Sequence, residues 1–443
     1  MKPRPSLVHE KLNHMHTKQL TTLLTCLFLT CACQVFGQEA VPIQSQRNHI
    51  RTVQLAPVSG PAAPPFVSLS GEPLRLSFDL LGDESPHCFL RFQHCTFDWF
   101  PSPDLEPADF MDGFQEPAVE VREVSFGTKV NYTHYEAVFP NDLTRFTKSG
   151  NYIVQVIDPA HPDAPLLTKR FVLYEHLSSF TPQLREPPQL EEIRTHQAID
   201  FTLQSGEYPL LDAYEALQVV VVQNGFWSHA LAGLVPRFVR GAEIDFRTAD
   251  LANFPGGNTW RFADLKSLRF VSQGVARIEE GERFWHFYLE ADERRAYKTF
   301  DARPDINGRF IIHNDQFEGA TESDYVMAHF RHPVAAEYPG DLYLVGAFSA
   351  GQLDDAYKLQ WDDAQQQYEA TVMLKQGYYN YMYAFVPNLR RSRPSASPLP
   401  DWYAAAEGNH HVAGNRYDFF AYYWDIEGYD RVIGHEVLEN GAR

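Results

Sequence analysis

The stretch that decides the fold is DLYLVGAFSAGQLDDAYKLQWDDAQQQYEATVMLKQGYYNYMYAF, residues 341–385. Its first run, residues 342–348, is apolar on both faces, as is typical of a strand covered on two sides. In the second run, residues 368–375, apolar side chains alternate with mainly polar ones, so Lys375 is expected opposite the apolar face. A third run after the turn at Gln376-Gly377 aligns aromatic rings at every second position from Tyr379 to Phe385. These runs predict a β-sandwich module.

Length and composition limit the possible organisations of the chain. At 443 residues it is long for one hydrophobic core, and about 100 to 200 residues per domain predicts two to four domains. Hydrophobic residues make up 44% of the chain, which is enough to build globular cores. The net charge of -19 disfavours non-specific binding to nucleic acid or anionic lipid, because both need a basic surface. A protein or a neutral ligand is therefore the expected partner.

Residues 1–37 have the pattern of an export signal. Lys18 precedes the apolar stretch LTTLLTCLFLTCACQVFG, and the small residue before Gln38 suits a cleavage site. Met15 is an alternative start, since a signal needs no long polar extension. A lipoprotein alternative rests on Cys33, but the residues before it match a lipoprotein cleavage box poorly. No later stretch approaches about 20 apolar residues, so the mature chain is expected to be exported without a transmembrane segment.

The remaining chain shows short alternating runs and almost no helical periodicity, which predicts an all-β protein of tandem immunoglobulin-like β-sandwich domains. We expect an N-terminal sandwich over residues 38–176 and a middle sandwich over residues 197–320. The proline-rich residues 177–196 between them indicate a linker or crossover. Residues 321–443 are expected to form a last sandwich of the early-set, glycogen-binding type.

Motifs for catalysis are missing from the sequence. No glycine-rich phosphate loop or nucleophile elbow is found, and His435-Glu436 lacks the second histidine of a zinc-protease motif. The two cysteines of the mature chain, Cys88 and Cys95, lie about 23 Å apart on one extended strand and on opposite faces, which rules out a disulfide between them in that geometry. The sequence therefore predicts no enzymatic activity, no metal and no cofactor.

A series of short motifs runs in one order along the mature chain. They are HCTFDW at 94–99, FMDGF at 110–114, SFGT at 125–128, YTHY at 132–135, FPN at 139–141, SGNY at 149–152, QN at 223–224, PGGN at 255–258, DING at 305–308, DY at 324–325, LKQGYYNY at 374–381, EGN at 407–409 and YDRVIG at 429–434. In this order they resemble the type IX secretion system plug protein family of Bacteroidota.

The resemblance implies a non-enzymatic periplasmic protein, and we expect the chain to be monomeric within its complex. It implies docking on the periplasmic mouth of the outer-membrane barrel translocon, which the protein closes when no cargo occupies the pore. Large aromatic and basic side chains are the candidates for contact with this partner. They are Trp227, Trp260 and a loop carrying Arg390, Arg391 and Arg393.

An alternative function is a carbohydrate-binding or accessory β-sandwich protein of the periplasm or cell surface. Gly346-Ala347-Phe348 and Gly377-Tyr378-Tyr379 resemble signatures of the glycogen-binding type of sandwich, and such modules bind sugars on exposed aromatic platforms. A glycoside hydrolase would need two carboxylates facing one cleft, and the sequence singles out no such pair. Exposure of the aromatic rings in the last module would separate the sugar-binding function from a protein-docking one.

Overall fold

The computed structural model describes residues 44–47, 49–247, 252–317, 319–388 and 399–441, and almost all regular structure among them is β-strand. The predicted all-β, tandem β-sandwich fold is confirmed. Among the described residues, none of the helices is both long and apolar enough to span a membrane. The predicted export signal lies outside the described residues.

The first module is a sandwich of two sheets, ordered β2-β4-β8-β7 and β1-β11-β10-β5, with β3 beside β11 and a small β6–β9 ribbon. Leu74, Leu76 and Phe78 alternate along β4 and are at most 1% exposed, so one face of this strand lies in the core. The elements of this module are β1 (Gln44–Gln46), β2 (Ile50–Pro57), β3 (Phe66–Ser68), β4 (Leu74–Leu81), β5 (Phe89–Cys95), α2 (Pro107–Phe110), β6 (Met111–Gly113), β7 (Val121–Val124), β8 (Tyr132–Phe139), β9 (Thr144–Phe146), β10 (Gly150–Ile157) and β11 (Leu167–Tyr174).

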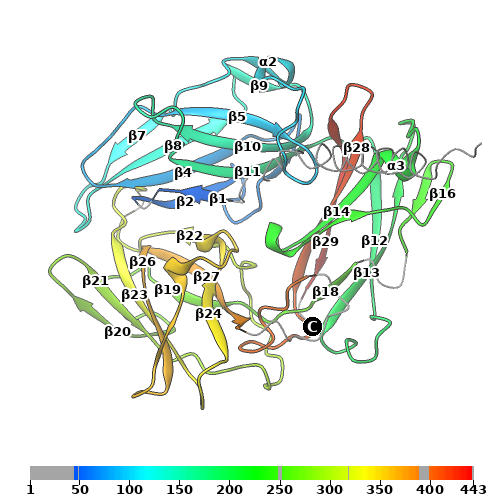
Figure 1. Ribbon diagram of the computed structural model, residues 1–443. Coiled ribbons are helices and arrows are strands. Elements are labelled where there is room, and N and C mark those ends of the chain that lie inside the picture. The colour runs from blue at the N-terminus through cyan, green and yellow to red at the C-terminus, as the bar shows by residue number, and fades with distance from the viewer. Residues whose placement is uncertain (1–43, 48, 248–251, 318, 389–398, 442–443) are drawn as a thin grey trace, which may run out of the picture. The chain divides into compact units, whose positions relative to one another are not determined.

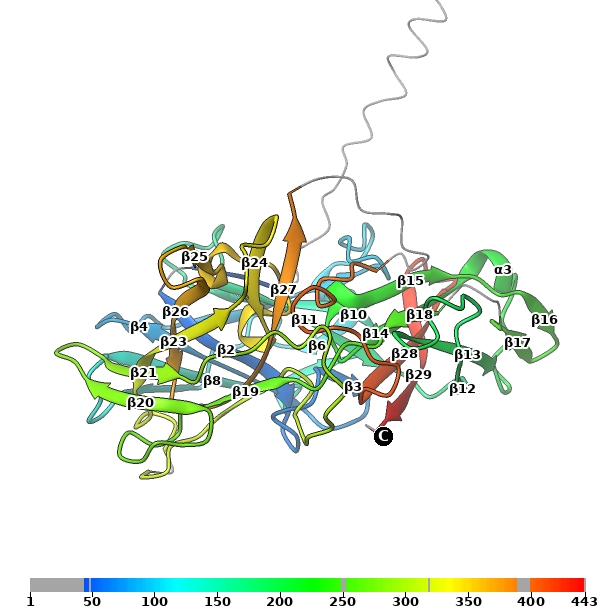
Figure 2. The same ribbon diagram turned by 90° about the horizontal axis from the view of Figure 1, so that it is seen from below.

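The third module contains the stretch on which the prediction rested, and its sheets are ordered β20-β21-β23-β26-β25 and β19-β27-β22, with β24 beside β27 (Figure 2). Strand β24 is buried on both faces: Leu342 and Leu344 lie in the core of the module, whereas Tyr343 and Val345 lie in a second apolar cluster. The elements are β19 (Arg261–Asp264), β20 (Val275–Glu280), β21 (Trp285–Leu289), β22 (Phe310–Ile312), β23 (Tyr325–Pro333), β24 (Gly340–Val345), η2 (Ala347–Ser349), η3 (Asp355–Tyr357), β25 (Gln360–Asp362), β26 (Gln367–Lys375) and β27 (Gly377–Pro387).

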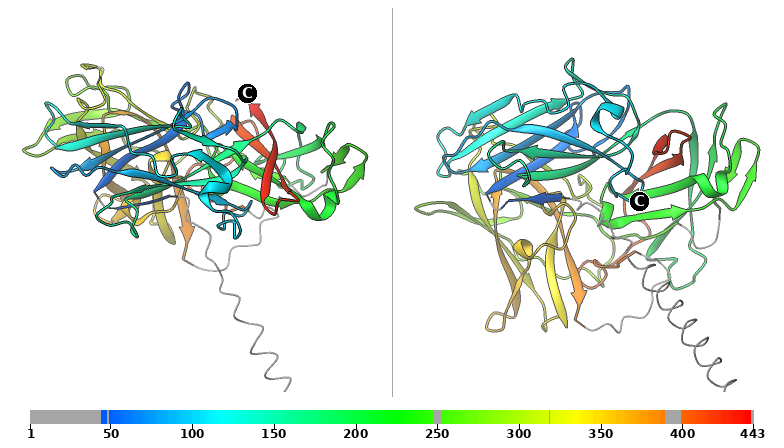
Figure 3. Two further views of the ribbon diagram at one scale, coloured as in Figure 1. Left: turned by 90° about the horizontal axis from the view of Figure 1, so that it is seen from above. Right: turned by 45° about the horizontal axis from the view of Figure 1, so that its top comes forward.

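The second module is built from two separate parts of the chain. Its sheets are ordered β12-β13-β17-β16, with β18 beside β13, and β15-β14-β28-β29. In Figure 3 the red strands near the C-terminus lie beside green strands of this module. The elements are β12 (Ser179–Arg185), β13 (His196–Gln204), α3 (Ala213–Ala216), β14 (Leu217–Gln223), η1 (Trp227–His229), β15 (Ala230–Leu234), β16 (Phe238–Arg240), β17 (Glu243–Asp245), β18 (Asn253–Pro255), β28 (Asn415–Trp424) and β29 (Asp430–Asn440).

This pairing differs from the domain boundaries that the sequence suggested. Strand β28 pairs with β14 over seven residues, so the end of the chain completes the second module instead of the third. The reason is burial: the Val run of β14 needs an apolar partner strand, and β28 supplies Phe419 and Ala421 to the same core. The segment expected as a linker contains β12, which tolerates Pro182 because it is an edge strand.

Apolar contacts also join the modules. One cluster combines Phe66, Trp99 and Val172 of the first module with Val220 and Phe420 of the second. Thus both faces of the sheet containing β14 and β28 are covered. Cys95 belongs to this contact cluster, whereas Cys88 lies in the core of the first module, and both thiols are free.

Candidate functional site at the junction of three modules

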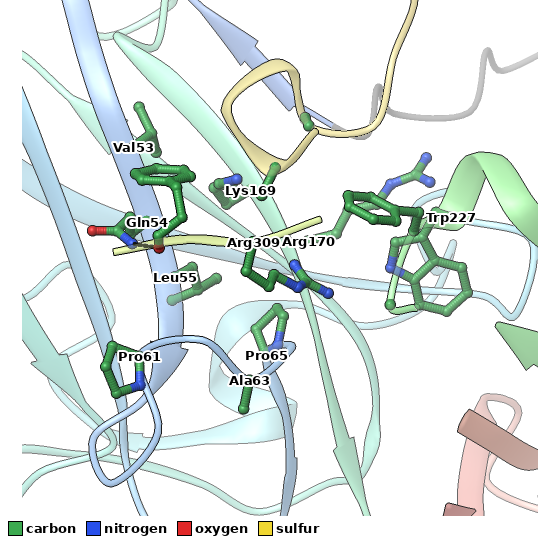
Figure 4. Close-up of a pocket in the computed structure, with 15 residues that line it drawn as sticks. Val53, Gln54, Leu55, Pro61, Ala63, Pro65, Lys169, Arg170, Trp227 and Arg309 are labelled. Carbon is green, nitrogen blue, oxygen red and sulfur yellow. Dashed lines mark hydrogen bonds between the residues drawn. The ribbon is translucent and has the colours of Figure 1, made fainter. Parts of the chain in front are cut away.

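A pocket lies where the three modules meet, and fifteen residues line it (Figure 4). Its cavity volume is about 70 Å³. The first module contributes β2, the loop before β3 and β11; the second contributes the turn after β14; the third contributes the start of β22 and η2. The lining residues are Val53, Gln54, Leu55, Pro61, Ala63, Pro65, Lys169, Arg170, Gly225, Phe226, Trp227, Arg309, Phe310, Ala347 and Ala350.

The turn Asn224-Gly225 of the second module positions the guanidinium of Arg309, which belongs to the third module. Both residues have positive φ, 53° and 67°, which the Asn-Gly pair accommodates at low cost. A Cβ at Gly225 would lie 2.1 Å from Arg309 Nη2, so only glycine admits the guanidinium here. Arg309 Nη2 donates to the Asn224 carbonyl oxygen at 2.9 Å, and the guanidinium lies 5.0 Å from the centre of the Phe226 ring. The third module is thereby tied to the second.

The pocket is strongly cationic. Three of its lining residues, Lys169, Arg170 and Arg309, carry positive charge, and none is Asp or Glu. Burial, together with the neighbouring Arg309, lowers the pKa of Lys169 to about 7. Burial also lowers the pKa of Arg309 to about 10, which leaves it charged at neutral pH. Two partly buried cations therefore influence each other in this pocket, an unfavourable arrangement that a bound anion would relieve.

A buried ion pair joins the first module to the third. Lys375 Nζ lies 2.6 Å from Asp79 Oδ2, and both side chains are 1% exposed. The hydroxyl of Tyr325 donates to Asp79 Oδ2 at 2.7 Å, and His134 Nδ1 lies 2.7 Å from Oδ1. Although burial alone would raise the pKa of Asp79, Lys375 and His134 outweigh it and hold this pKa below its ordinary value. The expectation from alternation, that Lys375 lies opposite the apolar face, holds, but that face is covered by another module.

A second buried network lies inside the third module and reaches a polar cavity of about 410 Å³. The carboxylate of Glu407, fully buried, accepts from Arg261 Nε at 3.0 Å and lies 2.7 Å from Arg295 Nη2. Arg261 Nη1 also lies 2.8 Å from Asp292, whose other oxygen accepts from the hydroxyls of Tyr381 and Tyr383. Every carboxylate in this network is paired with a cation or accepts from a hydroxyl, so we interpret the network as one that stabilises the fold.

The residues predicted to contact a partner lie in different surroundings. Trp227 is half-buried and packs edge-on against Trp99, with ring centres 4.7 Å apart. Trp260 is only 5% exposed and packs against Phe226. The junction pocket thus includes Trp227 and lies beside the cluster containing Trp260. Contact of either residue with a partner stays a prediction. The predicted loop residues Arg390, Arg391 and Arg393 lie outside the described residues.

The aromatic ridge of the third module is part of its core. The rings of Tyr379, Tyr381 and Tyr383 are at most 3% exposed. These rings therefore offer no platform to a sugar. Within the described ranges, no group of three or more His, Cys, Asp or Glu is arranged to hold a metal ion.

Exposed apolar side chains gather instead at one end of the second module. Leu211 and Tyr214, at α3, are 71% and 50% exposed, and Trp424 and Ile426, at the β28–β29 turn, are 47% and 97% exposed. The two segments touch, because the Leu211 amide donates to the Tyr423 hydroxyl at 3.1 Å (Figure 1). We call these four residues the tip patch. Exposed apolar patches of this kind mark interaction surfaces.

Sequence reasoning missed the charged residues that join the modules: Asp79, Lys169, Arg309 and Lys375. One local signal was available. Lys169 interrupts the apolar alternation of β11, where Leu167 and Phe171 lie in the core, and a charge in such a position is either exposed or paired. Which of the two applies depends on what covers the strand, and alternation carries no information about that.

The chain is similar to a solved structure over most of its length. The crystal structure of a hypothetical protein from Parabacteroides merdae has a TM-score of 0.81 and 28% identity, covering 89% of this chain and 98% of that chain. A structure described as manganese lipoxygenase of Gaeumannomyces graminis with part of zonadhesin of Komagataella pastoris has a TM-score of 0.14 and 7% identity, covering 90% of this chain and 96% of that chain. No curated protein matches the chain.

The family model described as the type 9 secretion system plug protein first domain matches residues 50–175. This segment coincides with strands β2 to β11 of the first module. The match includes the motifs from HCTFDW to SGNY. Residues 50–175 therefore match the first domain of the type IX secretion system plug protein family, the family that the sequence motifs resemble.

Proposed function

We propose that this protein is a periplasmic plug, which docks on the periplasmic face of the outer-membrane barrel translocon of the type IX secretion system and seals it when no cargo is in the pore. The family match over residues 50–175 carries this proposal, because the plug family is a structural component of secretion and not a known enzyme family. That family also suggests a location in the periplasm or at the outer membrane.

The way in which the modules are joined suits such a role. A plug must keep its shape while it fills an opening, so its parts have to be fixed to one another. The first and second modules share an apolar cluster, the first and third share the Asp79–Lys375 pair, and Arg309 links the third to the second. Contacts of three different kinds therefore oppose movement of one module against another.

The tip patch is our candidate for the docking surface. Its four large side chains are exposed to water in the free protein. Burying one such side chain completely against a partner would stabilise the complex by roughly 1.5 to 3 kcal/mol. An acidic chain with a net charge of -19 is repelled by anionic lipid, so we assign the patch to the translocon protein and not to the bilayer. Trp227, Trp260 and the loop at Arg390, Arg391 and Arg393 remain further candidates for contact with the same partner.

Co-purification tests the proposal. A tagged copy is expressed in cells that contain the translocon, and outer-membrane complexes are solubilised and captured on the tag. We expect the barrel translocon to be recovered with the tagged chain, which behaves as a monomer within the complex. Recovery of the tagged chain only as a free periplasmic protein, with the translocon present in the same cells, would refute the proposed function.

A pair of variants tests the docking surface separately. The double variant Leu211→Ser/Ile426→Ser removes apolar area from the tip patch, and we expect it to lose most of the co-purified translocon. The matched control Phe270→Ser/Tyr297→Ser changes side chains that are 75% and 86% exposed on the third module. If both double variants recover the translocon equally well, the plug function stands and the tip patch is the wrong surface.

A further inference from the structure

The junction pocket contains two cations, Lys169 and Arg309, that form no ion pair with a carboxylate among the described residues. One nitrogen of Arg309 donates a hydrogen bond to the Asn224 carbonyl oxygen. The charged residues that affect the pKa of Arg309 are Asp418 and Arg416, and these two form an ion pair with each other. For Lys169, the described part of the chain provides neither a carboxylate in an ion pair nor a hydrogen-bond acceptor for the ammonium. The lining contains Gln54 as a neutral polar group but no acid.

Bringing these cations together lowers the stability of the empty pocket. Lys169 and Arg309 are both partly shielded from water, and a shielded cation is stabilised by an opposite charge or by several acceptors. The mutual repulsion of Lys169 and Arg309 adds to the cost, and the pKa of Lys169 falls to about 7 in consequence. A structural ion pair would remove this cost, as Lys375 and Asp79 show elsewhere in the same protein.

The size and walls of the pocket limit what could provide the missing charge. A cavity of about 70 Å³ exceeds the roughly 10 to 15 Å³ that one water needs, but it excludes any large ligand. The lining also includes apolar groups, among them Val53, Phe226, Ala347 and Ala350. Cations beside apolar groups suit a compact anion with several acceptor oxygens, because charge-assisted hydrogen bonds are the strongest available here.

We infer that the junction pocket binds one small free oxyanion, of the phosphate or carboxylate class, between Lys169 and Arg309. The bound anion neutralises both cations and, because they belong to the first and third modules beside a turn of the second, it fastens the three modules together. This inference is independent of the proposed plug function, since it concerns only the assembly of the folded chain.

Titration calorimetry on the full mature chain tests the inference, with inorganic phosphate and acetate titrated separately at constant ionic strength. We expect saturable binding of one anion per chain for at least one of the two, which identifies the class. The variant Lys169→Gln should bind that anion about tenfold more weakly or worse, since it loses a charge-assisted hydrogen bond. The control Arg277→Gln, which changes an exposed cation on β20, should bind like the unaltered chain.

Thermal unfolding provides a second measurement, whose expected result differs from that for a lysine with only a structural role. The unaltered chain should unfold at a higher temperature in the anion that binds than in chloride, since a ligand of the native state stabilises it. Lys169→Gln should lose this increase and, in chloride, unfold at the same or a higher temperature than the unaltered chain, because repulsion from Arg309 is relieved. Absence of binding for both anions, or equal responses of Lys169→Gln and the unaltered chain, would overturn the inference.

Discussion

Replacing Lys375 by methionine should destabilise the protein by an amount that depends on pH. The change removes the cation 2.6 Å from Asp79 and the hydrogen bond from Lys375 Nζ to the Ala320 carbonyl oxygen, while it keeps most of the side-chain volume. Asp79 then remains buried with its hydrogen bonds to Tyr325 and His134. Breaking a buried ion pair in this way costs about 3 to 5 kcal/mol.

Protonation of Asp79 limits that cost. Its ordinary pKa is 3.8, so taking up a proton costs about 4 kcal/mol at pH 7 and about 2 kcal/mol at pH 5. In Lys375→Met the folded state binds this proton more tightly than the unfolded state does. The variant should therefore regain stability, relative to the unaltered chain, as the pH falls from 7 to 5.

Urea unfolding followed by tryptophan fluorescence at pH 7 and pH 5 measures both effects. Because a chain of several modules need not unfold in one step, the transition midpoints are compared as well as the free energies. The double variant Asp79→Asn/Lys375→Met should be more stable at pH 7 than Lys375→Met alone, since no buried charge is left over. The control Lys358→Met breaks an exposed pair with Asp341 at 2.9 Å and should leave the midpoint unchanged.

The reasoning is refuted if Lys375→Met lowers stability equally at both pH values, or if the double variant is no better than the single one. Either result would mean that Lys375 acts through its packing and not through its charge.

Three further predictions concern other buried groups. Burial would raise the pKa of Glu407, but the two arginines beside it hold this pKa at about 2. The ionised carboxylate therefore stabilises the fold by about 3 kcal/mol above pH 4.5, and this contribution is lost as the pH falls toward 2. In Glu407→Gln the unfolding temperature should consequently depend less on pH between 4.5 and 2. Burial raises the pKa of Asp430 to about 6, so between pH 4 and 6 the folded state holds a proton that the unfolded state has lost. The free energy of unfolding should therefore fall as the pH rises through this window. In Asp430→Asn, the unfolding temperature should not show this decrease. In Gly225→Ala the new Cβ collides with Arg309, and the positive φ of 67° adds strain, so chemical denaturation should show a loss of at least about 1 kcal/mol, whereas Gly241→Ala, also at positive φ but with open space around it, should lose less.

Much of each strand followed from the sequence because side-chain alternation is a local property. The run at β4 predicts its buried face, and the residues of β24 predict a strand covered on both sides. The ordered motifs predicted the family, and the match over residues 50–175 confirms that resemblance. In each case the information lies within a few neighbouring residues, where backbone geometry alone decides which side chains share a face.

Pairing between distant strands could not be predicted in the same way. The Pro-rich segment at β12 and the last hairpin, β28–β29, both have local patterns that suit more than one partner. Only the tertiary fold decides that β28 completes the sheet of β14, because the free energy comes from an apolar core shared by residues about 200 positions apart.

The same limit applies to the charged groups at the contacts between modules. The sequence determines an all-β chain of sandwiches with plug-family motifs, since periodicity, composition and motif order are local properties of the chain. The tertiary structure alone decides that Lys375 meets a carboxylate and that Lys169 meets another cation. Whether a charged side chain on a strand is exposed, paired or left beside another charge depends on the surface that covers the strand. Here that surface belongs to a different module.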